Sequence, residues 1–148
     1  MINKPFKITL LTIASSIGFT ACSLTPTQTV FPITQLEQVE NIDALPDTKT
    51  NIATLSKYKD RCVIKFTGYL EGGESTETWD FRKDKLNRAF SETFHYAPNS
   101  PVNNTTQKPE LDQNTRKVTI FDIQNTDVKS NFNKLKSHFN QSNLAQCH

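Results

Sequence analysis

One stretch near the middle of the chain, Arg61–Leu70 (RCVIKFTGYL), alternates two kinds of side chain and constrains the fold more than any other part. Apolar or small residues occupy every even position, whereas Arg61, Lys65 and Thr67 stand on the other parity. This period of two predicts a half-buried strand with Cys62 facing the core. A sheet with one buried face needs a covering layer, so the rest of the chain must supply further strands and a helix or second sheet.

Two turn signals follow this strand, with a second strand between them. Gly72 and Gly73 supply the positive φ angles that a tight hairpin uses, and the chain then returns as Ser75–Phe81 (STETWDF). The polar run Arg82–Lys85 (RKDK) predicts a second hairpin turn. The middle of the chain therefore predicts an antiparallel meander.

The segment Leu86–Tyr96 fits both a strand and a helix, because its apolar residues recur at even steps and also at steps of four. Those on one parity are Leu86, Phe90, Phe94 and Tyr96. We expect a strand, since Thr, Phe and Tyr are enriched and no clear helix cap follows the turn. Residues 97–115 then predict a long polar loop, and Lys117–Gln124 (KVTIFDIQ), apolar on both faces, predicts a central or covered strand.

The C-terminal segment predicts an amphipathic helix. Asn125, Thr126 and Asp127 offer side chains that can cap its start. An apolar stripe follows at steps of four, three and four residues: Val128, Phe132, Leu135 and Phe139. We expect the helix to fray over residues 140–143, after which Cys147 returns to the sheet.

The segments before Arg61 carry weaker patterns. Apolar residues between Ile33 and Leu45 recur at three-residue steps, a weakly helical spacing that Pro46 ends, and residues 51–60 predict a short helical turn. The predicted fold class is therefore α+β: an antiparallel sheet meander of about four strands with a C-terminal amphipathic helix packed on one face.

The N-terminus has the layout of a secretory signal. Lys4 and Lys7 precede an apolar run from Ile8 to Ala21 that ends in small residues, and this run is shorter than the roughly 20 residues that span a bilayer core. The stretch Phe19-Thr20-Ala21-Cys22 resembles the lipobox of bacterial lipoproteins, with Phe19 in the position where Leu is usual.

The resemblance covers residues 1–22 only and implies cleavage before Cys22, a diacylglyceryl group on its sulfur and acylation of the new amino group. Several acyl chains hold a protein stably on a membrane, because each buried CH₂ contributes about 0.8 kcal/mol. By analogy with Gram-negative lipoprotein sorting, Ser23 rather than Asp implies the outer membrane, with the domain facing the periplasm. The alternatives are an uncleaved hydrophobic helix, or a plain signal cut at another small residue such as Ala14 or Ser16.

This interpretation divides the chain into a signal peptide (residues 1–21), a flexible Thr- and Pro-containing tether (22–34) and a single small α+β domain (35–148) that includes the loop 97–115. Because lipid would occupy Cys22, the two other cysteines, Cys62 and Cys147, remain as a pair in an oxidising compartment. We therefore expect a disulfide between them.

The charge of the processed chain is balanced. Of the 17 Lys and Arg residues, Lys4 and Lys7 lie in the signal, so as many basic residues remain as there are Asp and Glu, 15 of each. A nucleic-acid-binding protein would show a clustered basic excess, so we expect no nucleic-acid partner. The lysines of the C-terminal helix predict a solvated face or, alternatively, contact with anionic lipid or lipopolysaccharide.

No motif for a hydrolase, a zinc peptidase or a nucleotide-binding protein is present, and we predict no catalytic residue, cofactor or metal. None of the three histidines lies in a recognisable motif; His95 and His138 are expected on the surface, and His148 is the C-terminal residue. The aromatic residues Trp79, Phe81, Phe90, Phe94 and Tyr96 form either a packed core or a groove for a ligand or a partner. The leading hypothesis is a non-enzymatic envelope lipoprotein that binds a protein or an envelope component. The alternatives are an enzyme acting on peptidoglycan or lipid, and a carrier of a small ligand.

Overall fold

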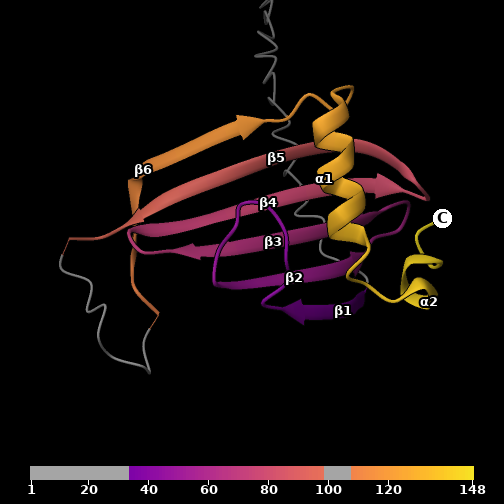
Figure 1. The fold of residues 1–148 in the computed structure, drawn as a ribbon, viewed down its shortest axis with the longest axis horizontal. Helices are drawn as coiled ribbons and strands as arrows, with labels where there is room; N and C mark the ends of the chain where they lie inside the picture. The colour runs from indigo at the N-terminus through magenta and orange to yellow at the C-terminus, as the bar shows by residue number, and fades with distance from the viewer. Residues whose placement is uncertain (1–33, 99–107) are drawn as a thin grey trace, which may run out of the picture.

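The computed structural model of the chain describes residues 34–98 and 108–148. These residues form one six-stranded antiparallel sheet in which each strand pairs with its neighbours in sequence, followed by a C-terminal helix and a short helical turn (Figure 1). The elements are β1 (Thr34–Glu40), β2 (Thr50–Lys57), β3 (Cys62–Leu70), β4 (Gly73–Arg82), β5 (Lys85–Tyr96), β6 (Leu111–Ile120), α1 (Thr126–Lys136) and α2 (Gln141–Leu144).

The predicted meander followed by a helix is confirmed, but the predicted number of strands is wrong. β1 and β2 form where the sequence indicated weak helices, and they extend the sheet beyond β3. On β2 the buried positions are Asn51, Ala53 and Leu55, which do alternate with period two. Because Asn51 is polar and Ala53 is small, the alternation of apolar residues was not visible in the sequence. Pairing with β3 decided the strand conformation.

The prediction that Lys117–Gln124 forms a covered strand is also wrong. β6 is one of the two edge strands of the described sheet and ends at Ile120, whose side chain is 75% exposed. Its start at Leu111 also shortens the predicted loop 97–115, of which residues 99–107 lie outside the described part of the chain. The apolar residues of this segment thus divide: Val118 and Ile120 on β6 are exposed, whereas Phe121 and Ile123 follow the strand and pack against the core.

The two hairpin turns lie where the sequence placed them, but the role of the glycines differs. Neither Gly72 nor Gly73 has a positive φ; that angle occurs instead at Lys83, with a φ of 54°. A Cβ atom built on Gly73 would lie 2.0 Å from the carbonyl oxygen of Phe94, whereas one on Gly72 would meet no atom within 4 Å. Gly73 is therefore required for close approach of two strands rather than for turn geometry.

β5 is a strand, as expected, but a bulge divides its apolar residues between the two faces. Phe81 pairs with Leu86, whereas Asp80 pairs with Arg88, so Asn87 is the additional residue. The bulge changes the parity, and Leu86 faces the core while Phe90 faces the opposite side. The prediction that both share one face is wrong for this reason.

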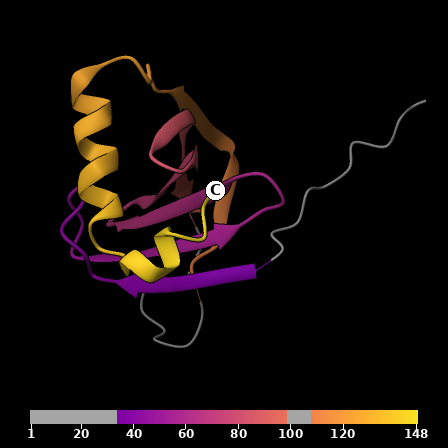
Figure 2. The ribbon, with the colours of Figure 1, turned by 90° about the vertical axis from the view of Figure 1, so that its right-hand side faces the viewer.

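The core lies between the sheet and α1, which crosses one face of it (Figures 1 and 2). The ring of Phe132 on α1 lies 5.9 Å from that of Trp79 and 5.2 Å from that of Phe81. The predicted cap is confirmed, because Oδ1 of Asn125 accepts hydrogen bonds from the backbone N–H groups of Asp127 and Val128. α1 ends at Lys136, and α2 forms where fraying was expected.

Three further contacts complete the layer on this face. The carboxylate of Glu37 on β1 accepts hydrogen bonds from Asn140 N (2.9 Å), Asn140 Nδ2 (2.7 Å) and Asn143 Nδ2 (2.9 Å), which ties α2 to the first strand. Asn51 exchanges hydrogen bonds with Ile42 and holds the β1–β2 loop against the sheet. In that loop Ala44 is buried in the core.

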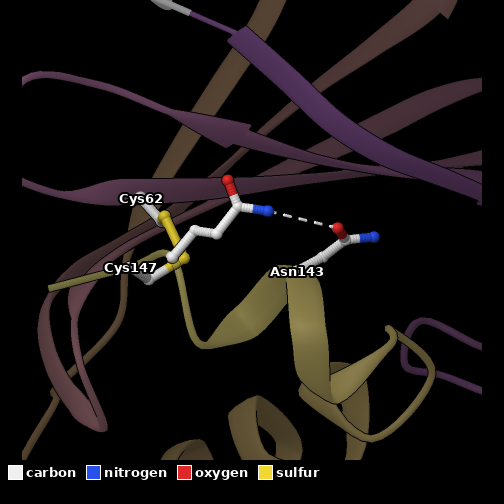
Figure 3. The surroundings of a disulfide bond; sticks show 4 residues. Cys62, Asn143 and Cys147 are labelled. Carbon is white, nitrogen blue, oxygen red and sulfur yellow. Dashed lines mark hydrogen bonds between the residues drawn. A yellow bond between two sulfur atoms is a disulfide. The ribbon is translucent and has the colours of Figure 1, made fainter.

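The predicted disulfide is present between Cys62 on β3 and Cys147 near the C-terminus (Figure 3). The two Cα atoms are 5.4 Å apart, 85 residues separate the cysteines in sequence, and both are buried. On the chain-entropy model, closing a loop of this size stabilises the fold by about 4–5 kcal/mol. The disulfide fastens the end of the helical layer to the centre of the sheet.

Candidate functional site

The described residues contain no arrangement typical of a catalytic or metal centre. No group of three or more His, Cys, Asp or Glu side chains within residues 34–98 and 108–148 could hold a metal ion. His95 and His148 are exposed, and Nε2 of the half-buried His138 lies 3.0 Å from the backbone oxygen of Asp43, a contact that helps to hold the β1–β2 loop beside α1. His138 therefore makes a structural contact, whereas His95 and His148 face solvent.

The aromatic residues divide into two groups. Trp79 and Phe81 are 2% and 1% exposed and pack against α1, so they belong to the core. Phe90, Phe94 and Tyr96 are half-buried on the other side of the sheet, because Trp79 pairs with Ala89 and neighbouring residues alternate. The sequence left two alternatives for these five residues, a packed core or a groove. Neither alternative describes all of them.

The side of the sheet opposite α1, called the open face here, carries no helix from the described part of the chain. Cross-strand neighbours form rows on it, and one such row runs Lys65, Thr78, Phe90 and Ile120. At the β5–β6 end of this face Ile120 and Val118, which is 45% exposed, lie beside Phe90. These three residues are called the apolar patch below.

The carboxylates that β4 and β5 place on the open face are all neutralised within the chain. Asp80 pairs with Arg61 at 2.8 Å, Glu74 pairs with Lys108 at 2.9 Å, and Glu92 pairs with Arg116. Arg116, two residues before Val118 on β6, is one of these paired cations, whereas two other cations of the open face have no such partner.

Arg88 and Lys65 have no carboxylate partner among the described residues. The guanidinium of Arg88 lies 4.7 Å from the centre of the Phe90 ring, a cation–π contact that leaves its charge intact. Arg88, which lies across from Asp80 on β4, therefore brings a cation without an ion pair of its own to the apolar patch.

One corner of the open face is a self-contained polar cluster. Glu74 is buried, and its contact with Lys108 raises the pKa of that lysine. Burial and the nearby Glu74 carboxylate raise the pKa of Tyr96, and the Lys108 ammonium lies 5.8 Å from the centre of the Tyr69 ring. The ion pair between Lys108 and Glu74 thus fastens the segment before β6 to the sheet.

Glu77 is a buried acid that the sequence interpretation missed. Its side chain faces the α1 side of β4 with 8% exposure and accepts a hydrogen bond from Trp79 Nε1 at 2.9 Å. Burial raises the pKa of Glu77 from 4.5 to about 7, against the smaller lowering effect of that hydrogen bond. The available signal was its parity, since Glu77 shares the core-facing positions of Trp79 and Phe81.

Comparisons of the chain with protein-family models, with curated proteins and with solved structures gave no match. The fold and the chemistry of the described residues therefore carry the functional argument.

The predicted lipidation site Cys22, the predicted signal peptide (1–21) and the predicted tether, except for Thr34, lie outside the described residues. Within the described residues no helix is long and apolar enough to cross a membrane.

Proposed function

We propose that this protein is a non-enzymatic lipoprotein of the cell envelope that binds another envelope protein through its open face. The lipid anchor is supported by the lipobox-like Phe19–Cys22, and an outer-membrane position facing the periplasm is supported by Ser23. A sheet with one face covered by α1 and the other without a covering helix among the described residues fits a tethered binding domain, since such a face is available to a partner.

The observation that carries the proposal is the exposed apolar patch beside cations that have no ion-pair partner among the described residues. Ile120 and Val118 are exposed next to Phe90, and contiguous exposed apolar residues mark interaction sites. Arg88 and Lys65 lack carboxylate partners in the described chain. A complementary partner surface presents apolar side chains flanked by Asp or Glu, because these carboxylates would form ion pairs with Arg88 and Lys65.

The position of β6 adds a second means of recognition. Its outer edge has no neighbouring strand in the described sheet, so its backbone N–H and C=O groups can pair with an extended segment of a partner. Such a segment would place alternate side chains over Val118 and Ile120. The carrier alternative has less support, because Trp79 and Phe81 fill the space between sheet and helix.

The proposal is tested by site-specific photo-crosslinking in cells that express the full chain. Benzoylphenylalanine replaces Ile120 in one variant and, as a matched control, the exposed Ser142 of α2 in another. We expect one discrete adduct from position 120, lost when Arg88→Glu is added, and none from position 142. Adducts of equal yield from both positions, or none from position 120, would contradict the docking face.

The anchor has a separate test. Mass spectrometry of the processed protein should find a lipidated cysteine at the new N-terminus. The variant Cys22→Ser should abolish this processing, so the signal peptide should not be released from the chain. An unmodified Cys22 thiol or an intact Met1 would overturn the lipoprotein assignment while leaving the docking face to its own experiment.

A further inference from the structure

On the opposite side of the sheet from the apolar patch, the β4–β5 turn and α1 enclose a groove of about 960 Å³. We call it the hairpin groove. Its floor contains Leu86 and Phe132, and Ile123 from the segment before α1 borders it. It is independent of the open face, so the inference below does not rest on the proposed function.

The charge of the hairpin groove is strongly one-sided. Four cations line it, Arg82, Lys83, Lys85 and Lys129, against the single carboxylate of Asp84. That carboxylate is already paired with Lys136, whose Nζ lies 2.7 Å from Asp84 Oδ1. None of the four lining cations has an ion-pair partner within the described ranges, so the residues that line the groove carry a net positive charge.

The walls of the groove are held in place by contacts from three parts of the chain. The Lys136–Asp84 pair joins α1 to the turn. The backbone N–H of Lys83 donates to the carbonyl oxygen of Cys147, and the disulfide fixes Cys147 to β3. Lys83 also has a positive φ of 54° at a position where a hairpin favours glycine. A charged residue kept in such a conformation is typical of functional sites.

The residue types indicate which anion fits. Three of the four cations are lysines, which commonly bind phosphate as compact point charges, and the arginine among them can also pair with phosphate oxygens. Leu86 and Phe132 also line the groove, and these apolar residues favour a ligand with an apolar portion beside its charge. Together these features match a phosphate-bearing amphiphile.

We infer that the hairpin groove binds the phosphate headgroup and adjoining apolar portion of an anionic lipid. The four cations receive the phosphate, and the apolar floor receives the start of the hydrocarbon. Binding weakens as ionic strength rises, because exposed charges are screened within about 10 Å at 0.1 M salt.

The test uses the full chain in a nonionic detergent and native mass spectrometry to count bound lipid. The probes are dihexanoylphosphatidylglycerol, zwitterionic dihexanoylphosphatidylcholine, inorganic phosphate and a Glu-rich peptide with apolar residues. The groove variant is Lys85→Glu with Lys129→Glu. The control is Lys59→Glu with Lys117→Glu, which changes the net charge by the same amount on exposed residues outside the groove.

We expect phosphatidylglycerol to bind in preference to phosphatidylcholine, with affinity reduced at least about tenfold in the groove variant and less than about twofold in the control. The single variant Lys129→Gln, a mild change on an exposed helix residue, should weaken binding about threefold. The inference is wrong if both lipids bind equally, if the control weakens binding as much, or if no lipid binds. If inorganic phosphate binds as tightly as phosphatidylglycerol, the apolar residues of the groove do not contribute to binding. If the Glu-rich peptide binds more tightly than the lipid, the groove binds a protein and the inference is wrong.

Discussion

Trp79 donates its indole N–H to the buried carboxylate of Glu77 across 2.9 Å, so an acid and the largest aromatic residue of the core share one face of β4. Burial raises the pKa of this acid to about 7. The protein therefore carries a group in its interior that changes its charge near neutral pH.

The stability of the fold should fall as pH rises through this range. The unfolded chain releases the Glu77 proton near pH 4.5, whereas the folded chain holds it until about pH 7. The contribution of Glu77 is thus fully present below pH 4.5, decreases by about 1.4 kcal/mol per pH unit above it, and is lost above about pH 7. The total amounts to about 3 kcal/mol.

Glu77→Gln tests this dependence, because its amide oxygen still accepts the Trp79 hydrogen bond but cannot ionise. We expect the variant to match the parent near pH 4.5 and to exceed its free energy of unfolding by about 2–3 kcal/mol at pH 8, measured by urea denaturation. Glu40→Gln, at an exposed position, should show no such divergence. Parallel pH profiles for parent and Glu77→Gln would exclude the raised pKa.

Removal of the disulfide should lower stability without preventing assembly of the sheet. In the double variant Cys62→Ser, Cys147→Ser we expect a loss of about 4–5 kcal/mol in the free energy of unfolding, since the unfolded chain regains the entropy of an open loop. Alkylation of the parent provides the control: both thiols should react only after reduction. Reaction of either thiol in the folded, unreduced protein would contradict the pairing.

Asn51 should be among the most sensitive polar positions. Its buried side chain accepts from Ile42 N at 2.9 Å and donates to the carbonyl oxygens of Ile42 and Thr48 at 3.0 and 3.1 Å. Asn51→Ala leaves these backbone groups without partners and should cost about 2–4 kcal/mol.

The control for Asn51 is Asn87→Ala, whose exposed side chain makes one long contact of 3.5 Å. It should change the free energy of unfolding by less than about 0.5 kcal/mol. Hydrogen exchange should also show loss of protection in the β1–β2 loop for Asn51→Ala alone; unchanged exchange there would refute its anchoring role.

The two adjacent glycines of the first hairpin should respond in opposite directions to alanine. In Gly73→Ala the new methyl group would lie 2.0 Å from the Phe94 carbonyl oxygen, so β4 and β5 must separate, at a cost of about 1–3 kcal/mol. Gly72→Ala meets no atom within 4 Å and requires no positive φ, so it should be neutral or stabilise by about 0.4–1 kcal/mol. Thermal unfolding of the two variants compares them directly, and equal effects would contradict the close strand approach.

Part of the candidate sites could be predicted from sequence and part could not. The sequence showed the two cysteines and the lysines of the helix, but it did not show which residues lie beside them in the fold. Glu77 carried a readable signal in its parity. The hairpin groove carried none, because it joins Lys85 and Lys129 from segments far apart in the chain.

By itself the sequence determined the features that depend on neighbouring residues: the alternation of β3, the polar turn at residues 82–85, the capped start of α1 at Asn125 and its apolar stripe. Local backbone preferences and side-chain periodicity are sufficient for these. The tertiary structure alone decided that β6 is an edge, that the bulge at Asn87 separates Leu86 from Phe90, and that Asn51 is buried. These outcomes depend on which strand lies beside which, and that choice follows from burial summed over the whole sheet rather than from any single segment.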